Sequence, residues 1–129
     1  MYRIFQSEHS TALDYIHIVL EKTKNNHDLA LIIFKKLFAE LPEQLDRIED
    51  RLTVEDFENA REITHKMHGS VSFCGLTEIQ EPTKKLEQCL LNNNYEKASK
   101  YLLQLKQKVS TFMRYQDRIL VGLSENAMQ

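Results

Sequence analysis

Glu62-Ile-Thr-His-Lys-Met-His-Gly-Ser-Val-Ser-Phe-Cys-Gly-Leu76 is the stretch around which we expect this chain to fold. It sets His65 one helical turn before Gly69. Glycine inside a helix costs about 1 kcal/mol relative to alanine, so its presence needs a reason. Helical side chains tilt toward the N-terminus, and a side chain at position 69 would therefore lie over His65. Its absence leaves the imidazole reachable by a macromolecule.

The same stretch has two distinct faces when it is drawn as a helix. Polar or small residues lie within about 60° of His65 at 100° per residue. They are Glu58, Arg61, Glu62, His68, Gly69 and Ser72. The opposite face forms a stripe that can be buried, made of Ala60, Ile63, Met67, Ser70, Val71 and Cys74. The pattern predicts that His65 points to solvent from the middle of a helix.

Apolar residues at steps of three and four continue this helical pattern in both directions. Toward the N-terminus, we predict one helix at about residues 10–24 and a second at 28–51, kinked at Pro42. Thr53, supported by Asp56 in a capping box, is expected to cap the helix that carries His65. That helix ends near residue 74, where Gly75 suits a left-handed turn. Further helices are predicted from Leu76 to a turn at 92–94, bent by Pro82, and at about 95–121.

The short connections between these helices predict antiparallel neighbours. With three glycines, two prolines and no alternating segments, the sequence favours an all-α fold. We predict an antiparallel up-down four-helix bundle with an additional N-terminal helix. The 129 residues are expected to form a single domain with its core at about 10–121 and a frayed end at 122–129.

Composition narrows the classes of function. The formal net charge is −2, and basic residues are interleaved with acidic ones, which argues against a nucleic-acid surface. The longest apolar run, 29–34, is far too short for a membrane span, and no signal peptide is evident. Cys74 and Cys89 are expected about 20 Å apart along two helices, too far for a disulfide. A cytoplasmic location is the expectation, either for a free protein or for a piece of a membrane-anchored one.

Several roles for the histidine pair are open from the residues alone. An ordinary surface histidine is the simplest. Glu62, His65 and His68 offer three metal ligands at successive i, i+3 steps, but helical zinc pairs more often use i, i+4 spacing. Hydrolytic catalysis lacks a nucleophile–base pair, a phosphate loop and an obvious pocket.

Of these roles, carrying a phosphoryl group requires the fewest groups from the chain itself. A neutral imidazole attacks an activated phosphoryl group on a partner and later releases it. The reaction requires an exposed ring nitrogen and a nearby cation, which His65 with His68 and Lys66 provides.

His65-Lys66-Met67-His68-Gly69, followed by a second glycine ten residues after the histidine, resembles the motif of the histidine-containing phosphotransfer (HPt) domain. The likeness extends from about residue 14 to 109. It is greatest to the HPt modules of BarA-type hybrid sensor kinases, where the motif reads His-Lys-Leu-His-Gly-Ser followed by an aromatic residue. Thr64 stands where many members have alanine, and His68 where they have lysine.

This resemblance implies that His65 accepts a phosphoryl group from a receiver-domain aspartate and relays it to a response-regulator aspartate. Gly69 would provide clearance. The chain lacks a nucleotide-binding motif, so a kinase activity would belong to a longer hybrid sensor kinase, and Mg²⁺ would be bound by the receiver. The domain itself would need no cofactor or metal, would contact neither nucleic acid nor membrane, and would be a monomer.

Two hypotheses concern the neighbours of His65. In the first, His68 leans back toward His65 and, when protonated, stabilises the transferring phosphoryl oxygens. Its charge is conditional, because imidazole loses its proton near neutral pH. In the second, a receiver docks across the third and fourth helices, on Lys66, Gly69, Ser72, Phe73, Gln80, Lys84 and Glu87, with Phe73 alternatively capping the core. A helical adaptor that is never phosphorylated is the alternative function.

Overall fold

The structure is a computed structural model that describes the backbone of residues 2–127 and the side chains of residues 11–125. The described backbone forms six helices and no strand, which confirms the predicted all-α class. They are α1 (Tyr2–Lys22), α2 (His27–Thr53), α3 (Phe57–Phe73), α4 (Thr77–Leu91), α5 (Ala98–Met113) and α6 (Gln116–Ala127).

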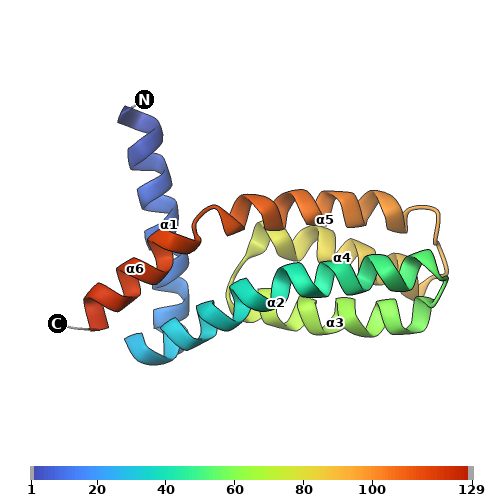
Figure 1. Cartoon of the computed structure of the whole chain (residues 1–129), viewed down its shortest axis with the longest axis horizontal. Helices are drawn as coiled ribbons and strands as arrows, with labels where there is room; N and C mark the ends of the chain where they lie inside the picture. Colours follow the sequence, from blue (N-terminus) through green and yellow to red (C-terminus); the bar gives the residue numbers. More distant parts are fainter. Residues whose placement is uncertain (1, 128–129) are drawn as a thin grey trace.

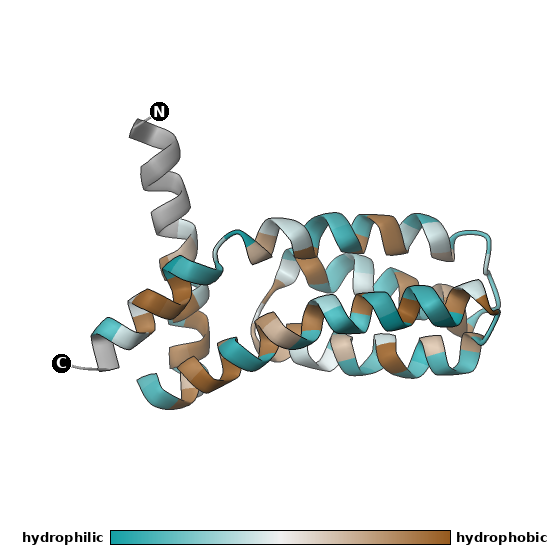
Figure 2. Ribbon diagram, viewed as in Figure 1, coloured by the Kyte–Doolittle hydropathy of each residue, from teal (hydrophilic) through white to brown (hydrophobic). Residues whose placement is uncertain are grey.

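Helices α2 to α5 form the bundle. Each contacts the next along the chain, and α2 also contacts α5, which closes the ring of four. Successive helices run in opposite directions along the long axis of the molecule (Figure 1). In the ribbon coloured by hydropathy, apolar (brown) and polar (teal) segments alternate along the bundle helices (Figure 2). Fully buried residues from all four helices make its core, among them Leu41, Ile48, Met67, Leu86 and Leu105.

Helices α1 and α6 pack at one end of the bundle, on each other and on α2 (Figure 1). The extra N-terminal helix was predicted, but it begins earlier than about residue 10. The prediction of one last helix over 95–121 was wrong, because Arg114 and Tyr115 form a turn between α5 and α6. Residues 122–127, expected to fray, continue α6, and Leu123 is fully buried. Residues 128 and 129 lie outside the described part.

The start of α3 differs in detail from the prediction. Asp56, not Thr53, is the N-cap, and its side chain accepts a hydrogen bond from the backbone N–H of Asn59 at 3.3 Å. Thr53 is instead the last residue of α2 and donates its hydroxyl to the carbonyl of Glu49 at 2.9 Å. Helix α2 continues through Pro42.

The end of α3 is as predicted. Gly75 follows the C-cap with φ of +67°, in the left-handed region. The backbone N–H of Leu76 donates to the carbonyl of Val71 at 2.9 Å, which closes the Schellman turn. A Cβ on Gly75 would lie 2.6 Å from Cγ2 of Ile18 on α1. Glycine is therefore required here both by the backbone and by the packing of α1.

The cysteines and the apolar segments of the helices were the subject of two further predictions. Cys74 and Cys89 are free thiols, as predicted, and both are buried. None of the helices in the described part is long and apolar enough to span a bilayer.

Candidate functional site

His65 lies at the centre of α3, with its side chain 74% exposed. The helix is anchored by the predicted stripe on its other face, where Ala60, Ile63, Met67, Val71 and Cys74 are buried and Ser70 is half-buried. The periodicity of the sequence therefore placed His65 on the correct side of the helix. A ring held in this way is presented to solvent by a rigid element.

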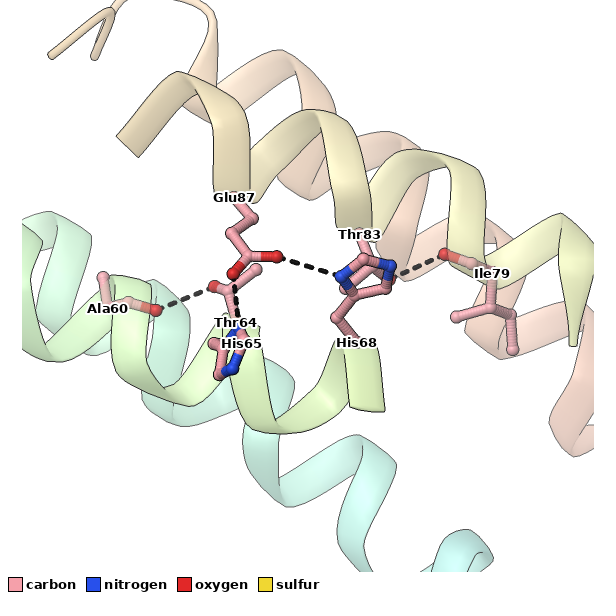
Figure 3. A network of polar contacts seen from close by, with 7 residues as sticks. All are labelled: Ala60, Thr64, His65, His68, Ile79, Thr83 and Glu87. Atoms are coloured by element: carbon pink, nitrogen blue, oxygen red, sulfur yellow. Dashed lines mark hydrogen bonds and ion pairs between the residues drawn. The ribbon is translucent and has the colours of Figure 1, made fainter. Parts of the chain in front are cut away.

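A single carboxylate on α4 joins the two histidines of α3 (Figure 3). Nδ1 of His65 lies 2.6 Å from Oε2 of Glu87, and Nδ1 of His68 lies 2.9 Å from Oε1 of the same residue. The Glu87 side chain is 13% exposed and that of His68 is 24% exposed, so both are largely covered by the α3–α4 contact. Of the three groups, His65 alone extends well into solvent.

The charge of Glu87 determines which nitrogens carry hydrogens. Burial raises the pKa of the Glu87 carboxyl, but the hydrogen bonds from His65 and His68 outweigh it and bring the pKa below its ordinary value of 4.5. Near neutral pH the group is therefore an ionised carboxylate, which can only accept hydrogen bonds. Both Nδ1 atoms must then be donors. In neutral His65 this leaves the lone pair on Nε2.

Glu87 lies in a different environment from the one predicted. It was expected to be an exposed docking residue, whereas it lies within the site as the partner of both histidines. Its position follows from the core seam of α4, since Thr83, Leu86 and Leu90 are buried and Glu87 borders them on the side of α3. Matching that seam to the stripe on α3 would have suggested the contact. The pattern of either helix alone does not.

Two buried threonines flank this network (Figure 3). Thr64 is fully buried, and its Oγ1 donates to the carbonyl of Ala60 at 2.7 Å. Thr83 on α4 is also fully buried and donates in the same way to the carbonyl of Ile79 at 2.6 Å. Each hydroxyl hydrogen is used within its own helix. Neither is therefore available to donate to Glu87.

The other predicted docking residues lie on both α3 and α4. Lys66 and Lys84 are exposed, whereas Ser72 and Gln80 are half-buried. Phe73 is 47% exposed, so it does not cap the core. Instead, Nζ of Lys22 on α1 lies 5.1 Å from the centroid of its ring.

Gly69 borders a groove between α2 and α3. A Cβ added to Gly69 would meet no heavy atom within 4 Å beyond its own helix backbone, so internal packing does not require glycine here. The groove is lined by residues of both helices: Ile33, Lys36, Leu37, Glu40, Gly69, Ser70, Phe73 and Cys74. This groove was not predicted, because the docking surface was expected on the side of α4.

The suggested metal ligands do not converge. His68 turns toward Glu87 on α4, whereas Glu62 lines a pocket on the α2 side together with Arg47 and Lys66. Across the part of the chain that the structure describes, no group of three or more His, Cys, Asp or Glu side chains is arranged to hold a metal ion.

Comparison with known proteins adds independent information. A family model described as "Hpt domain" matches residues 33–115. The chain is 27% identical over 112 residues to the signal transduction histidine-protein kinase BarA of Escherichia coli (strain K12). The proteins of that name from Escherichia coli O157:H7 and Shigella flexneri match equally. The alignment covers 86% of this chain but only 12% of the relative's length. No solved structure shows significant similarity.

Proposed function

The chain belongs to the Hpt domain family, which acts in histidine phosphotransfer in two-component signalling, and from this premise we propose that His65 is its phosphoryl-carrying residue. His65 would accept the group from a receiver-domain aspartate and pass it to a response-regulator aspartate. The observation that carries the proposal is the combination of a 74% exposed ring with an Nδ1 atom bonded to Glu87. This arrangement leaves a lone pair on Nε2 of an exposed ring.

The reaction follows from that arrangement. The lone pair on Nε2 of His65 attacks the phosphorus of the aspartyl phosphate, and the bond between phosphorus and the aspartate oxygen breaks. Its electron pair stays on the departing carboxylate. The imidazole becomes a phosphorylated cation whose Nδ1–H still faces the Glu87 carboxylate at 2.6 Å in the resting geometry. An opposite charge at this distance stabilises the cation that forms. The second transfer is the reverse step onto another aspartate.

The partner supplies what the chain does not. We propose that the receiver binds the Mg²⁺ that neutralises the phosphoryl oxygens, and that His65 and its neighbours only position the nucleophile. The work of such partners is intracellular signalling, so we place the domain in the cytoplasm. Because the chain spans 12% of the length of BarA, we assign it the carrier step alone. In a longer protein it would be the phosphotransfer module of a hybrid sensor kinase.

We place the docking surface over Gly69 and along the groove between α2 and α3. Phe73 and Ile33 provide apolar area there, and Lys36 with Glu40 provides a polar rim. The predicted surface toward α4 offers less, because Glu87 is engaged by the two histidines. The exposed residues Lys66 and Lys84 would lie at the edges of the interface. A relay interface is expected to be small, since the partner must leave after transfer.

The test is transfer from a phosphorylated receiver domain to the purified chain. We expect label that is labile in acid and stable in base on the wild type, and none on His65→Gln. The matched control is His17→Gln, which changes an exposed histidine of α1 outside the residues matched by the family model. Label on His65→Gln would overturn the assignment, and so would a loss of label that occurs in His17→Gln alone. A wild-type chain that binds receivers but takes no label would be the helical adaptor.

A further inference from the structure

His68 does not face the exposed side of α3 as the sequence suggested. Its Nδ1 lies 2.9 Å from Oε1 of Glu87, and the side chain is 24% exposed. Figure 3 shows the ring turned toward α4. The ring of His65, by contrast, is 74% exposed. The two histidines are therefore one turn apart but differ in surroundings, and they meet only through the carboxylate between them.

A glutamate carboxylate is a poorly fixed group when it has a single partner. Three torsions separate it from the backbone, and the last is broad and roughly two-fold. One hydrogen bond to His65 would leave the carboxylate free to turn about that contact. The second bond, from His68 to the other oxygen, removes this freedom. The hydroxyls of Thr64 and Thr83 are bonded within their own helices, so neither substitutes as a donor.

Resting on the proposed function, we propose that His68 is a positioning residue that acts through Glu87: it holds the carboxylate so that the other oxygen keeps the hydrogen of His65 on Nδ1 and the lone pair on Nε2. His68 itself does not touch the phosphoryl group. This replaces the direct electrostatic role suggested by the sequence. Nδ1 of His68, which would stabilise the phosphoryl oxygens in that role, is already hydrogen-bonded to Glu87.

The positioning role and the direct role differ in their need for charge. Nδ1 of His68 donates to Glu87 both in the imidazolium and in the neutral Nδ1–H form. Positioning therefore requires a donor at this place but no positive charge. An asparagine places its amide nitrogen close to the location of the histidine Nδ1. His68→Asn should consequently preserve positioning, whereas His68→Ala removes it, and stabilisation of the phosphoryl group by charge would be lost in both.

The first measurement needs no phosphoryl group. Nitrogen-15 NMR of the imidazoles in the full chain reports which ring nitrogen of neutral His65 carries hydrogen. We expect the Nδ1–H form in the wild type, a mixture of the two forms in His68→Ala, and the wild-type form again in His68→Asn. An unchanged His65 spectrum in His68→Ala would overturn the proposal. This readout remains valid even if His65 proves not to carry phosphate, so the two assignments fail separately.

The second measurement is a double-mutant cycle on the rate of transfer from a phosphorylated receiver. His68→Ala should slow transfer about tenfold, because a hydrogen bond that positions a reacting group is of this order. In a Glu87→Ala background the same change should have almost no further effect. A loss of equal size in both backgrounds would show that His68 acts directly on the phosphoryl group. Far-UV circular dichroism of each variant establishes that it is folded. If His68→Ala is not folded, His68→Asn provides the test, because it should keep the wild-type transfer rate if His68 positions Glu87 and lose it if His68 acts by charge.

Discussion

Oε2 of Glu87 accepts a hydrogen bond from Nδ1 of His65 at 2.6 Å, although the two residues are 22 positions apart in the chain. The bond crosses from α4 to α3 and connects the middle of one helix to the last turns of the other. It therefore links the orientation of the exposed ring to the packing of the bundle.

The stabilising contribution of Glu87 should disappear in acid. Its pKa in the folded chain lies below the ordinary value of 4.5, so folding favours the carboxylate form. A contribution of this kind is fully present above the ordinary pKa and is lost as the pH falls through the lower pKa of the folded state. We expect the difference in unfolding free energy between wild type and Glu87→Gln to shrink across that window. Urea unfolding at stepped pH measures it, and a constant difference would contradict the assignment.

Gly69→Ala should make the chain more stable while it slows phosphoryl transfer. The added methyl group meets no heavy atom within 4 Å beyond the helix backbone, so the helix gains about 0.5–1 kcal/mol from replacing glycine. Transfer from a receiver should fall with the size of the side chain, by about tenfold or more for Gly69→Leu, because the partner must approach His65 over this position. Urea unfolding and transfer rates check the two effects. Unchanged transfer in Gly69→Leu would exclude docking over Gly69.

Gly75→Ala should have the opposite effect on stability. Its φ of +67° disfavours alanine, and the new Cβ would lie 2.6 Å from Cγ2 of Ile18. That atom belongs to a β-branched side chain with little rotameric freedom, so it cannot easily turn aside. We expect a loss of about 1–3 kcal/mol. In an Ile18→Ala background the loss should be smaller, because only the backbone cost remains. Equal losses in both backgrounds would show that the contact with α1 is unimportant.

Leu123→Ala tests whether α6 is part of the folded core. Leu123 is fully buried, and its truncation should cost about 2–4 kcal/mol. Val121 lies on the same helix and is 54% exposed, so Val121→Ala should change the unfolding free energy by less than about 0.5 kcal/mol. Thermal and urea unfolding of the pair provide the comparison. Similar small effects for both would mean that α6 contributes little to stability.

Much of this fold could be predicted from the sequence because helical periodicity is a local property. The spacing of Ala60, Ile63, Met67 and Val71 defined the buried side of α3 and so the exposure of His65. The left-handed turn at Gly75 was predicted because such turns favour glycine. The boundary between α5 and α6 was missed, since neither proline nor glycine marks it and the apolar steps continue to Ile119 and beyond.

The site was harder to predict because its main contact joins separate helices. His65 and Glu87 meet through the relative rotation of α3 and α4, which their packing determines and a single helical wheel does not contain. The burial of Thr64 was not predicted for a related reason. Its hydroxyl bonds to its own helix at Ala60, so a polar residue can be buried at no cost in hydrogen bonds.

The central position of His65 in α3, eight residues from Phe57 and eight from Phe73, has a consequence for how a carrier of this kind selects its partners. The turns at either end are about 12 Å away along the helix axis, too far to open or close over the ring. The ring that we propose as the nucleophile is thus exposed before any encounter with a partner. On the proposed function, the surface around the ring would then discriminate between one receiver and another. The frequency of collisions in the right orientation would set the rate of exchange.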